Sequence, residues 1–118
     1  YRVTALFDSV SGLKDGATVE IAGVEVGKVE DISLSDDDRA HVKIRIRGDV
    51  KITNDVIASI RTKGIIGDRY IKLDQGGSEK YISAGGEIRE TTPPMDIEEL
   101  IGQFIFGKVD SASKEKTK

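Results

Sequence analysis

The clearest strand signal in the sequence is the alternating run His41-Val42-Lys43-Ile44-Arg45-Ile46-Arg47. Its β-branched residues, Val42, Ile44 and Ile46, fall on one side of an extended chain, and polar side chains fall on the other. This pattern is typical of an antiparallel strand with one face packed on a core and the other in water. The run therefore predicts a sheet protein in which this strand is half-buried.

The composition extends this prediction to the whole chain. Among its 118 residues there are fifteen Ile and ten Val but only five Leu. Side chains branched at Cβ are stiff and fit a pleated surface better than a helix. Apolar residues make up 37% of the chain, and the 13 Gly bring this share to about half, as in ordinary globular domains. We therefore expect one folded all-β domain and exclude a disordered chain.

Turn residues divide the chain into about seven strands, at the spacing of a small barrel or sandwich. Gly27 interrupts one strand, which predicts a β-bulge or a close backbone approach. In the strand at 18–21, Val19 and Ile21 share one face. The predicted strands are residues 2–7, 18–21, 24–26, 28–34 as a separate strand after Gly27, 41–47, 56–61, 69–73 and 87–90.

Several classes of function are disfavoured. A net charge of −3 with both signs dispersed leaves no basic footprint for nucleic acid. With no Cys, a single His and no nucleotide, nucleophile or metal motif, we expect neither an enzyme nor a cofactor or metal site. The run Asp36-Asp37-Asp38 lacks the spacing of a calcium loop and is expected at a solvated hairpin tip. The basic row on residues 41–47 could meet an anionic partner, but a solvated face is the preferred interpretation.

One feature that a plain barrel does not need is the loop Gly64-Ile65-Ile66-Gly67. Turns are usually polar, yet two Ile lie here between flexible glycines. Adjacent residues of an extended chain point to opposite sides, so both cannot enter the same small core. Leaving them in water would forgo about 1.5–3 kcal/mol for each side chain. Either the loop folds back over its own barrel, or it forms a contact or ligand surface.

A second such feature is a short amphipathic helix after Pro93 and Pro94. Asp96 and Glu99 form a capping pattern that would begin it, and Gly107 would end it. Its apolar stripe consists of Ile97, Leu100, Ile101, Phe104 and Ile105. A helix of about ten residues is not stable alone in water, so the stripe must pack on its own barrel or on equivalent helices of other subunits. The stiff Pro-Pro connector favours the second arrangement.

The chain therefore divides into three predicted parts. Residues 1–92 form the barrel, residues 93–107 the connector and helix, and residues 108–118, rich in Lys and Ser, a disordered tail. No apolar run in the chain is long enough to span a bilayer. The sequence opens on Tyr1 rather than Met and runs directly into a predicted strand, which is typical of a segment cut from a longer protein in which an N-terminal anchor could precede it.

Three separated motifs resemble the MCE (mammalian cell entry) family. Residues 7–13 and 19–29 resemble the opening of an MCE domain, F-D-x-(V/I)-x-G-L followed by V-x-(I/L)-x-G-V-x-V-G-x-V. Residues 61–70 resemble the family's R-T-x-G-(L/I)-(L/I)-G-x-x-Y segment. Residues 95–107 resemble the C-terminal segment of those MCE proteins that maintain lipid asymmetry of the outer membrane. The resemblance runs from Tyr1 to about Gly107, with the motifs in the family's order.

The resemblance implies a small β-barrel of about seven strands that assembles into a homohexameric ring. It implies a periplasmic domain held to the inner membrane by an N-terminal helix absent from this chain. Its partners would be separate ABC permease and ATPase subunits and a soluble periplasmic lipid carrier. Phospholipid would cross between the membranes through a central hydrophobic pore. Gly64, Ile65, Ile66 and Gly67 would form the pore loop, and the helix stripe would extend the pore.

Three alternatives stand beside this interpretation. The chain could be a structural ring that docks a lipid carrier without touching lipid. It could be an MCE protein that carries another hydrophobic substrate, such as a sterol. It could also be a monomeric barrel in which Ile65 and Ile66 belong to the core.

Overall fold

The chain folds into an all-β domain, as its composition predicts. The computed structural model describes residues 1–64 and 67–94, and this part of the chain contains eight strands. They are β1 (Arg2–Phe7), β2 (Thr18–Ile21), β3 (Val24–Leu34), β4 (Ala40–Ile46), β5 (Ile57–Thr62), β6 (Arg69–Asp74), β7 (Glu87–Ile88) and β8 (Glu90–Thr92). The segment predicted as one strand at 87–90 forms two short strands on either side of Arg89, whereas the two strands predicted at 24–26 and 28–34 are one continuous strand, β3.

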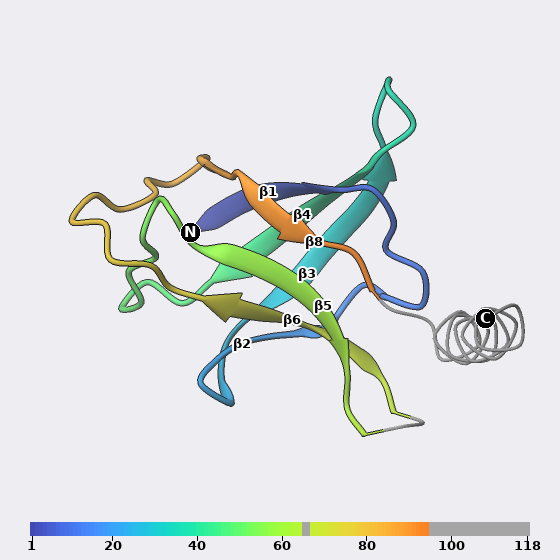
Figure 1. Ribbon diagram of the computed structural model, residues 1–118, viewed down its shortest axis with the longest axis horizontal. Helices are drawn as coiled ribbons and strands as arrows, with labels where there is room; N and C mark the ends of the chain where they lie inside the picture. Colours follow the sequence, from blue (N-terminus) through green and yellow to red (C-terminus); the bar gives the residue numbers. More distant parts are fainter. Residues whose placement is uncertain (65–66, 95–118) are drawn as a thin grey trace, which may run out of the picture.

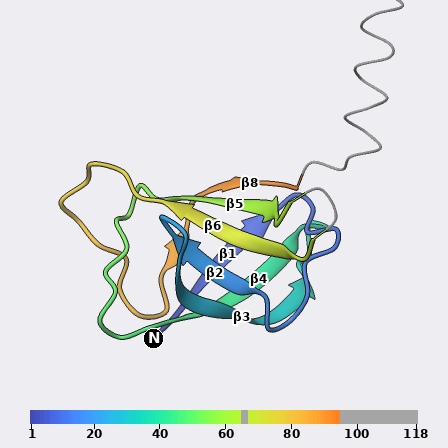
Figure 2. The ribbon, with the colours of Figure 1, turned by 90° about the horizontal axis from the view of Figure 1, so that it is seen from below.

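These strands form a single sheet that closes into a barrel (Figure 1, Figure 2), in the order β7-β1-β4-β3-β2-β6-β5-β8. β7 pairs in parallel with β1 at one edge, and β8 pairs in parallel with β5 at the other. The short segment 87–92 thus bridges both edges of the sheet. The line along which the two edges meet is here called the Thr91 seam. Across it, the Thr91 hydroxyl donates a hydrogen bond to the Leu6 carbonyl over 2.7 Å. This near-closure covers most of the edges of the sheet, which would otherwise pair with other chains.

The barrel interior is filled by the side chains that the alternation predicts. Val42, Ile44 and Ile46 of β4 are at most 1% exposed, while Arg45 between them is exposed. The predicted half-buried strand is therefore confirmed, and burial of each aliphatic side chain contributes about 1.5–3 kcal/mol. Other fully buried large side chains are Val3, Phe7, Val19, Ile52, Val56, Ile71, Leu73 and Ile88.

Gly27 lies where β3 passes close to β4. A Cβ atom at this position would lie 2.2 Å from the carbonyl oxygen of Arg45, so any larger residue would push the two strands apart. The register between β2 and β3 shifts at the same place, because Val19 pairs with Gly27 but Glu20 pairs with Glu25. Both predicted features, the bulge and the close approach, are confirmed at this glycine.

The two ends of the barrel carry different elements. Tyr1 is held at one end, where its backbone nitrogen donates to the Ile46 carbonyl over 2.9 Å and its hydroxyl to the Val50 carbonyl over 2.6 Å. The opposite end carries the hairpin between β5 and β6 and the end of β8, which runs parallel to β5 (Figure 1). The chain therefore enters the barrel at one end, and its described part leaves at the other.

Two further findings concern the described residues alone. Within residues 1–64 and 67–94, no helix has the length and apolarity needed to cross a membrane. In the same part of the chain, no group of three acidic or histidine side chains is placed to hold a metal ion. Asp36, Asp37 and Asp38 occupy the turn between β3 and β4, as predicted for a hairpin tip.

Candidate functional site

The β5–β6 hairpin, which carries the predicted pore loop, requires both of its glycines. Gly64 has a φ of 73°, in the left-handed region that favours glycine. A Cβ atom at Gly67 would lie 1.7 Å from the carbonyl oxygen of Lys63. The hairpin is closed where the Lys63 amide donates to the Asp68 carbonyl over 3.1 Å. The structure thus gives a backbone reason for both glycines of the motif.

The apolar candidates themselves lie outside the described residues. Ile65 and Ile66 occupy the gap between residues 64 and 67, and the helix stripe begins beyond residue 94. Their roles remain predictions. The stripe residues concerned are Ile97, Leu100, Ile101, Phe104 and Ile105.

An ion pair anchors the base of this hairpin to the barrel wall. The Lys63 ammonium lies 2.8 Å from the carboxylate of Glu20 on β2, which also accepts a 3.1 Å hydrogen bond from the Thr18 hydroxyl. Glu20 is only 8% exposed. The same ammonium lies 5.3 Å from the centre of the Tyr70 ring, within the range of a cation–π contact. Lys63 is thereby held on two sides, directly before the first glycine of the loop.

The charges in this pair stabilise each other. The hydrogen bond from Lys63 is the main reason that the pKa of Glu20 lies below its ordinary value, and the same bond raises the pKa of Lys63. Sequence reasoning missed this contact, since an acid between Val19 and Ile21 is the normal outward residue of an alternating strand. No local signal links Glu20 to a lysine so far along the chain.

A hollow of about 400 Å³ lies beside the hairpin base. It lies between the turn that precedes β2 and the start of β6. The ladder that joins β2 to β6 is short and contains only two residue pairs. Arg69 reaches into this region against Gly12, because a Cβ atom at Gly12 would lie 2.9 Å from its side chain. The lining residues are Gly12, Lys14, Asp15, Gly16, Ala17, Thr18, Lys63, Asp68, Arg69 and Tyr70.

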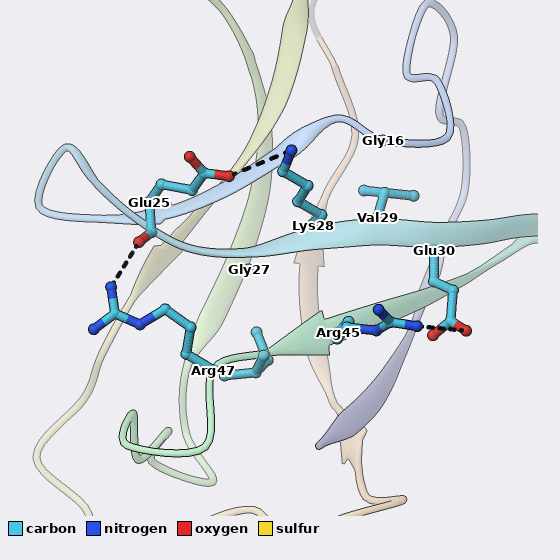
Figure 3. Close-up of a pocket in the computed structure, with 9 residues that line it drawn as sticks. Gly16, Glu25, Gly27, Lys28, Val29, Glu30, Arg45 and Arg47 are labelled. Atoms are coloured by element: carbon cyan, nitrogen blue, oxygen red, sulfur yellow. Dashed lines mark hydrogen bonds and ion pairs between the residues drawn. The ribbon is translucent and has the colours of Figure 1, made fainter.

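A larger hollow of about 590 Å³ lies on the β3–β4 face around Gly27 (Figure 3). Each of its three cations has an acidic partner. Lys28 lies 4.0 Å from Glu25, Arg45 lies 3.6 Å from Glu30, and Arg47 lies 2.8 Å from Asp49. These pairs are exposed and contribute little free energy. Because Arg45 and Arg47 of the basic row have acidic partners on the surface, the structure supports its interpretation as a solvated face.

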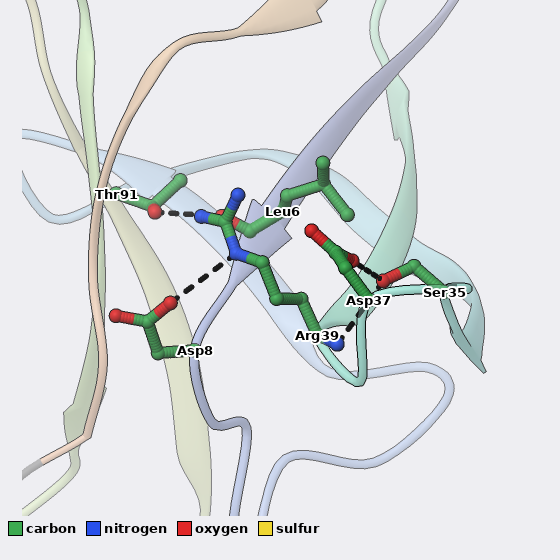
Figure 4. A network of polar contacts seen from close by, with 6 residues as sticks. All are labelled: Leu6, Asp8, Ser35, Asp37, Arg39 and Thr91. Atoms are coloured by element: carbon green, nitrogen blue, oxygen red, sulfur yellow. Dashed lines mark hydrogen bonds and ion pairs between the residues drawn. The ribbon is translucent and has the colours of Figure 1, made fainter.

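A polar network at the β3–β4 turn serves the fold (Figure 4). Arg39 lies 3.2 Å from Asp8, which follows β1, and its amide donates to the Ser35 hydroxyl over 3.1 Å. Ser35 also hydrogen-bonds Asp37, which lowers the pKa of that carboxyl group. Together these contacts hold the acidic hairpin against the end of β1, close to the Thr91 seam.

Comparison with known proteins identifies this arrangement of barrel and hairpin. The family described as MlaD protein matches residues 1–76, and thus most of the barrel and the whole β5–β6 hairpin. The chain belongs to the MlaD family. The resemblance to MCE domains is confirmed, and within that resemblance the match is to MlaD.

Two curated MlaD proteins extend the match along the chain. The protein from Haemophilus influenzae is 38% identical over 124 aligned positions, which cover 99% of this chain and 73% of that protein. The protein from Escherichia coli K12 is 34% identical over 122 positions, covering 97% of this chain and 66% of that protein. Both are named intermembrane phospholipid transport system binding protein MlaD.

A solved structure agrees with the MlaD assignment in three dimensions. A chain of the Acinetobacter MlaFEDB complex, in its ATP-bound Vtrans1 conformation, superposes with a TM-score of 0.83 at 25% identity. The match covers 88% of this chain and 80% of that one. The barrel described above is therefore similar to one that has been observed inside a multi-subunit complex.

Proposed function

We propose that this chain is the lipid-binding ring subunit of an ABC transporter that moves phospholipids between the inner and outer membranes. The observation that carries the proposal is the 38% identity to a named phospholipid transport binding protein over 99% of the chain. The similarity to a chain of the MlaFEDB complex supports a permease and an ATPase as partners. The ring would stand in the periplasm, anchored to the inner membrane and serving a soluble lipid carrier.

The proposed mechanism is passive and hydrophobic. Each CH₂ group of an acyl chain costs about 0.8 kcal/mol when exposed to water, so a tail of about 16 carbons faces a barrier of about 12 kcal/mol. Six copies of Ile65 and Ile66 around one axis would lower this barrier by lining a path. The terminal helices would lengthen that path with Leu100, Ile101, Phe104 and Ile105. No bond chemistry is needed, and the ATPase would supply directionality.

The geometry of the hairpin supports this role for its tip. The Glu20–Lys63 pair and the Tyr70 ring fix the base, and the two glycines fix the turn. A firm base and a fixed turn are what a loop needs if its two Ile are to line a path for lipid. The fastened Tyr1 lies at the opposite end, so an anchor before it would leave the hairpin end directed away from the membrane.

A photo-crosslinking amino acid at Ile66 tests the proposal in cells. We expect phospholipid adducts on the intact ring, identified by mass spectrometry. The matched control is the same amino acid at Leu34, which is 74% exposed at the end of β3 and should give no adduct. An intact ring that gives no lipid adduct at Ile66 would overturn lipid conduction and favour the carrier-docking alternative. Sterol adducts would instead indicate that the substrate is a sterol.

A further inference from the structure

The hollow beside the hairpin base combines charges of both signs with a position next to the apolar loop. Lys63 and Asp68, which flank Gly64 and Gly67, belong to its lining. The hollow therefore begins within two residues of Ile65 and Ile66. Its volume of about 400 Å³ lies within the usual range of small-molecule sites. A polar hollow of this size suits the polar head group of an amphipathic ligand.

The charges of the hollow are balanced once Glu20 is counted. Lys63 is engaged by Glu20 over 2.8 Å. The lining also contains two other cations, Lys14 and Arg69, and two carboxylates, Asp15 and Asp68. A purely anionic ligand would leave the carboxylates facing its negative charge. A ligand with one negative and one positive group can complement both kinds of side chain.

Two local features hold the walls of the hollow in place. The Arg69 side chain lies against Gly12, whose φ of 83° and missing Cβ leave room for the guanidinium stem. Lys14 and Asp15 lie in a turn closed by the Ala17 amide, which donates to the Lys14 carbonyl over 3.1 Å. Both of these side chains are exposed, so they are available to a ligand without a role in the core.

We infer that this hollow binds the phosphoethanolamine head group of a zwitterionic phospholipid. Lys14 would contact the phosphate, and Asp15 and Asp68 would accept hydrogen bonds from the primary ammonium. Choline lacks the N–H donors that the carboxylates need, and phosphoglycerol lacks the positive charge. The inference rests on the proposed function and adds to it a preference among head groups at the entrance to the pore loop.

The head groups captured by the Ile66 crosslinker provide the test. We expect the ratio of ethanolamine to glycerol lipid in the adducts to exceed that of the total membrane extract by about three-fold, the effect of one exposed ion pair. The double variant Lys14→Gln/Asp15→Asn should return this ratio to that of the extract. The matched control, Lys28→Gln/Glu25→Gln, makes the same exchange in the hollow of Figure 3 and should leave the enrichment unchanged.

The outcomes separate this inference from the proposed function. No phospholipid adduct in the parent protein would overturn the proposed function itself. Adducts at the membrane ratio, or an enrichment that survives Lys14→Gln/Asp15→Asn, would overturn the head-group site alone. A second measurement uses the free head groups: glycerophosphoethanolamine should shift the amide NMR signals of Gly16 and Arg69, and glycerophosphoglycerol should not. Equal shifts with both compounds would also count against the site.

Discussion

Two hairpins of the barrel each connect a pair of antiparallel strands, but the residues at their tips are of opposite character. The β3–β4 hairpin exposes three aspartates and is held by surface contacts of Arg39 and Ser35. The β5–β6 hairpin has two Ile at its tip and is held by the largely buried Glu20 against Lys63. An acidic tip is satisfied by water, whereas an apolar tip needs a partner. A firm base below an apolar tip is what the proposed contact outside its own barrel would require.

The strongest test of this contrast places a charge on the apolar tip. Ile66→Asp should abolish phospholipid transport while the barrel stays folded, because the carboxylate would meet acyl chains rather than core side chains. Leu34→Asp makes a matched exchange beside the acidic hairpin and should leave transport intact, since Leu34 is already 74% exposed. Transport is measured as detergent resistance of cells that lack their own copy. If Ile66→Asp unfolds the barrel, the tip belongs to the core.

The second test removes the backbone freedom of the apolar hairpin. Gly67→Ala should destabilise the domain by about 1–3 kcal/mol, because its Cβ would collide with the Lys63 carbonyl. Gly48→Ala is the control, since a Cβ there meets nothing within 4 Å, and its effect should stay within about 0.5 kcal/mol. Urea unfolding measures both. Equal effects of the two substitutions would contradict the requirement for glycine at position 67.

The third test addresses the base of the hairpin and depends on pH. Because the pKa of Glu20 is lowered by folding, the stability it contributes is present above its unfolded pKa and is lost as pH falls through its folded pKa. The difference in melting temperature between the parent and Glu20→Gln should therefore be full at neutral pH and shrink in acid. A difference that stays constant with pH would contradict the ion pair. Asp37→Asn, in the exposed turn, should show a smaller difference.

The smallest effect is expected at the acidic hairpin. Arg39→Gln breaks an exposed pair with Asp8, which is worth about 0–1 kcal/mol. Its urea midpoint should thus move less than that of Glu20→Gln at neutral pH. The reverse order would mean that the acidic hairpin, rather than the apolar one, has the firmly held base.

The features predicted from the sequence are those that depend on neighbouring residues. Alternation alone placed Val42, Ile44 and Ile46 in the core, and the break at Gly27 indicated the bulge. The split of the last strand was missed, because it depends on pairing with two strands that lie far back in the chain. The Glu20–Lys63 pair was missed for the same reason. Its members meet only after the barrel has closed.

The bridging segment 87–92 also sets the stage of synthesis at which the barrel can complete its folding. The two edges of the sheet, β1 and β5, are covered only by residues close to the end of the barrel sequence. During synthesis, every earlier strand can leave the ribosome while both edges still offer unpaired backbone to other chains. The barrel is thus sealed by one of its last-made parts, and a chain that stops before residue 87 would leave β1 and β5 open to aggregation.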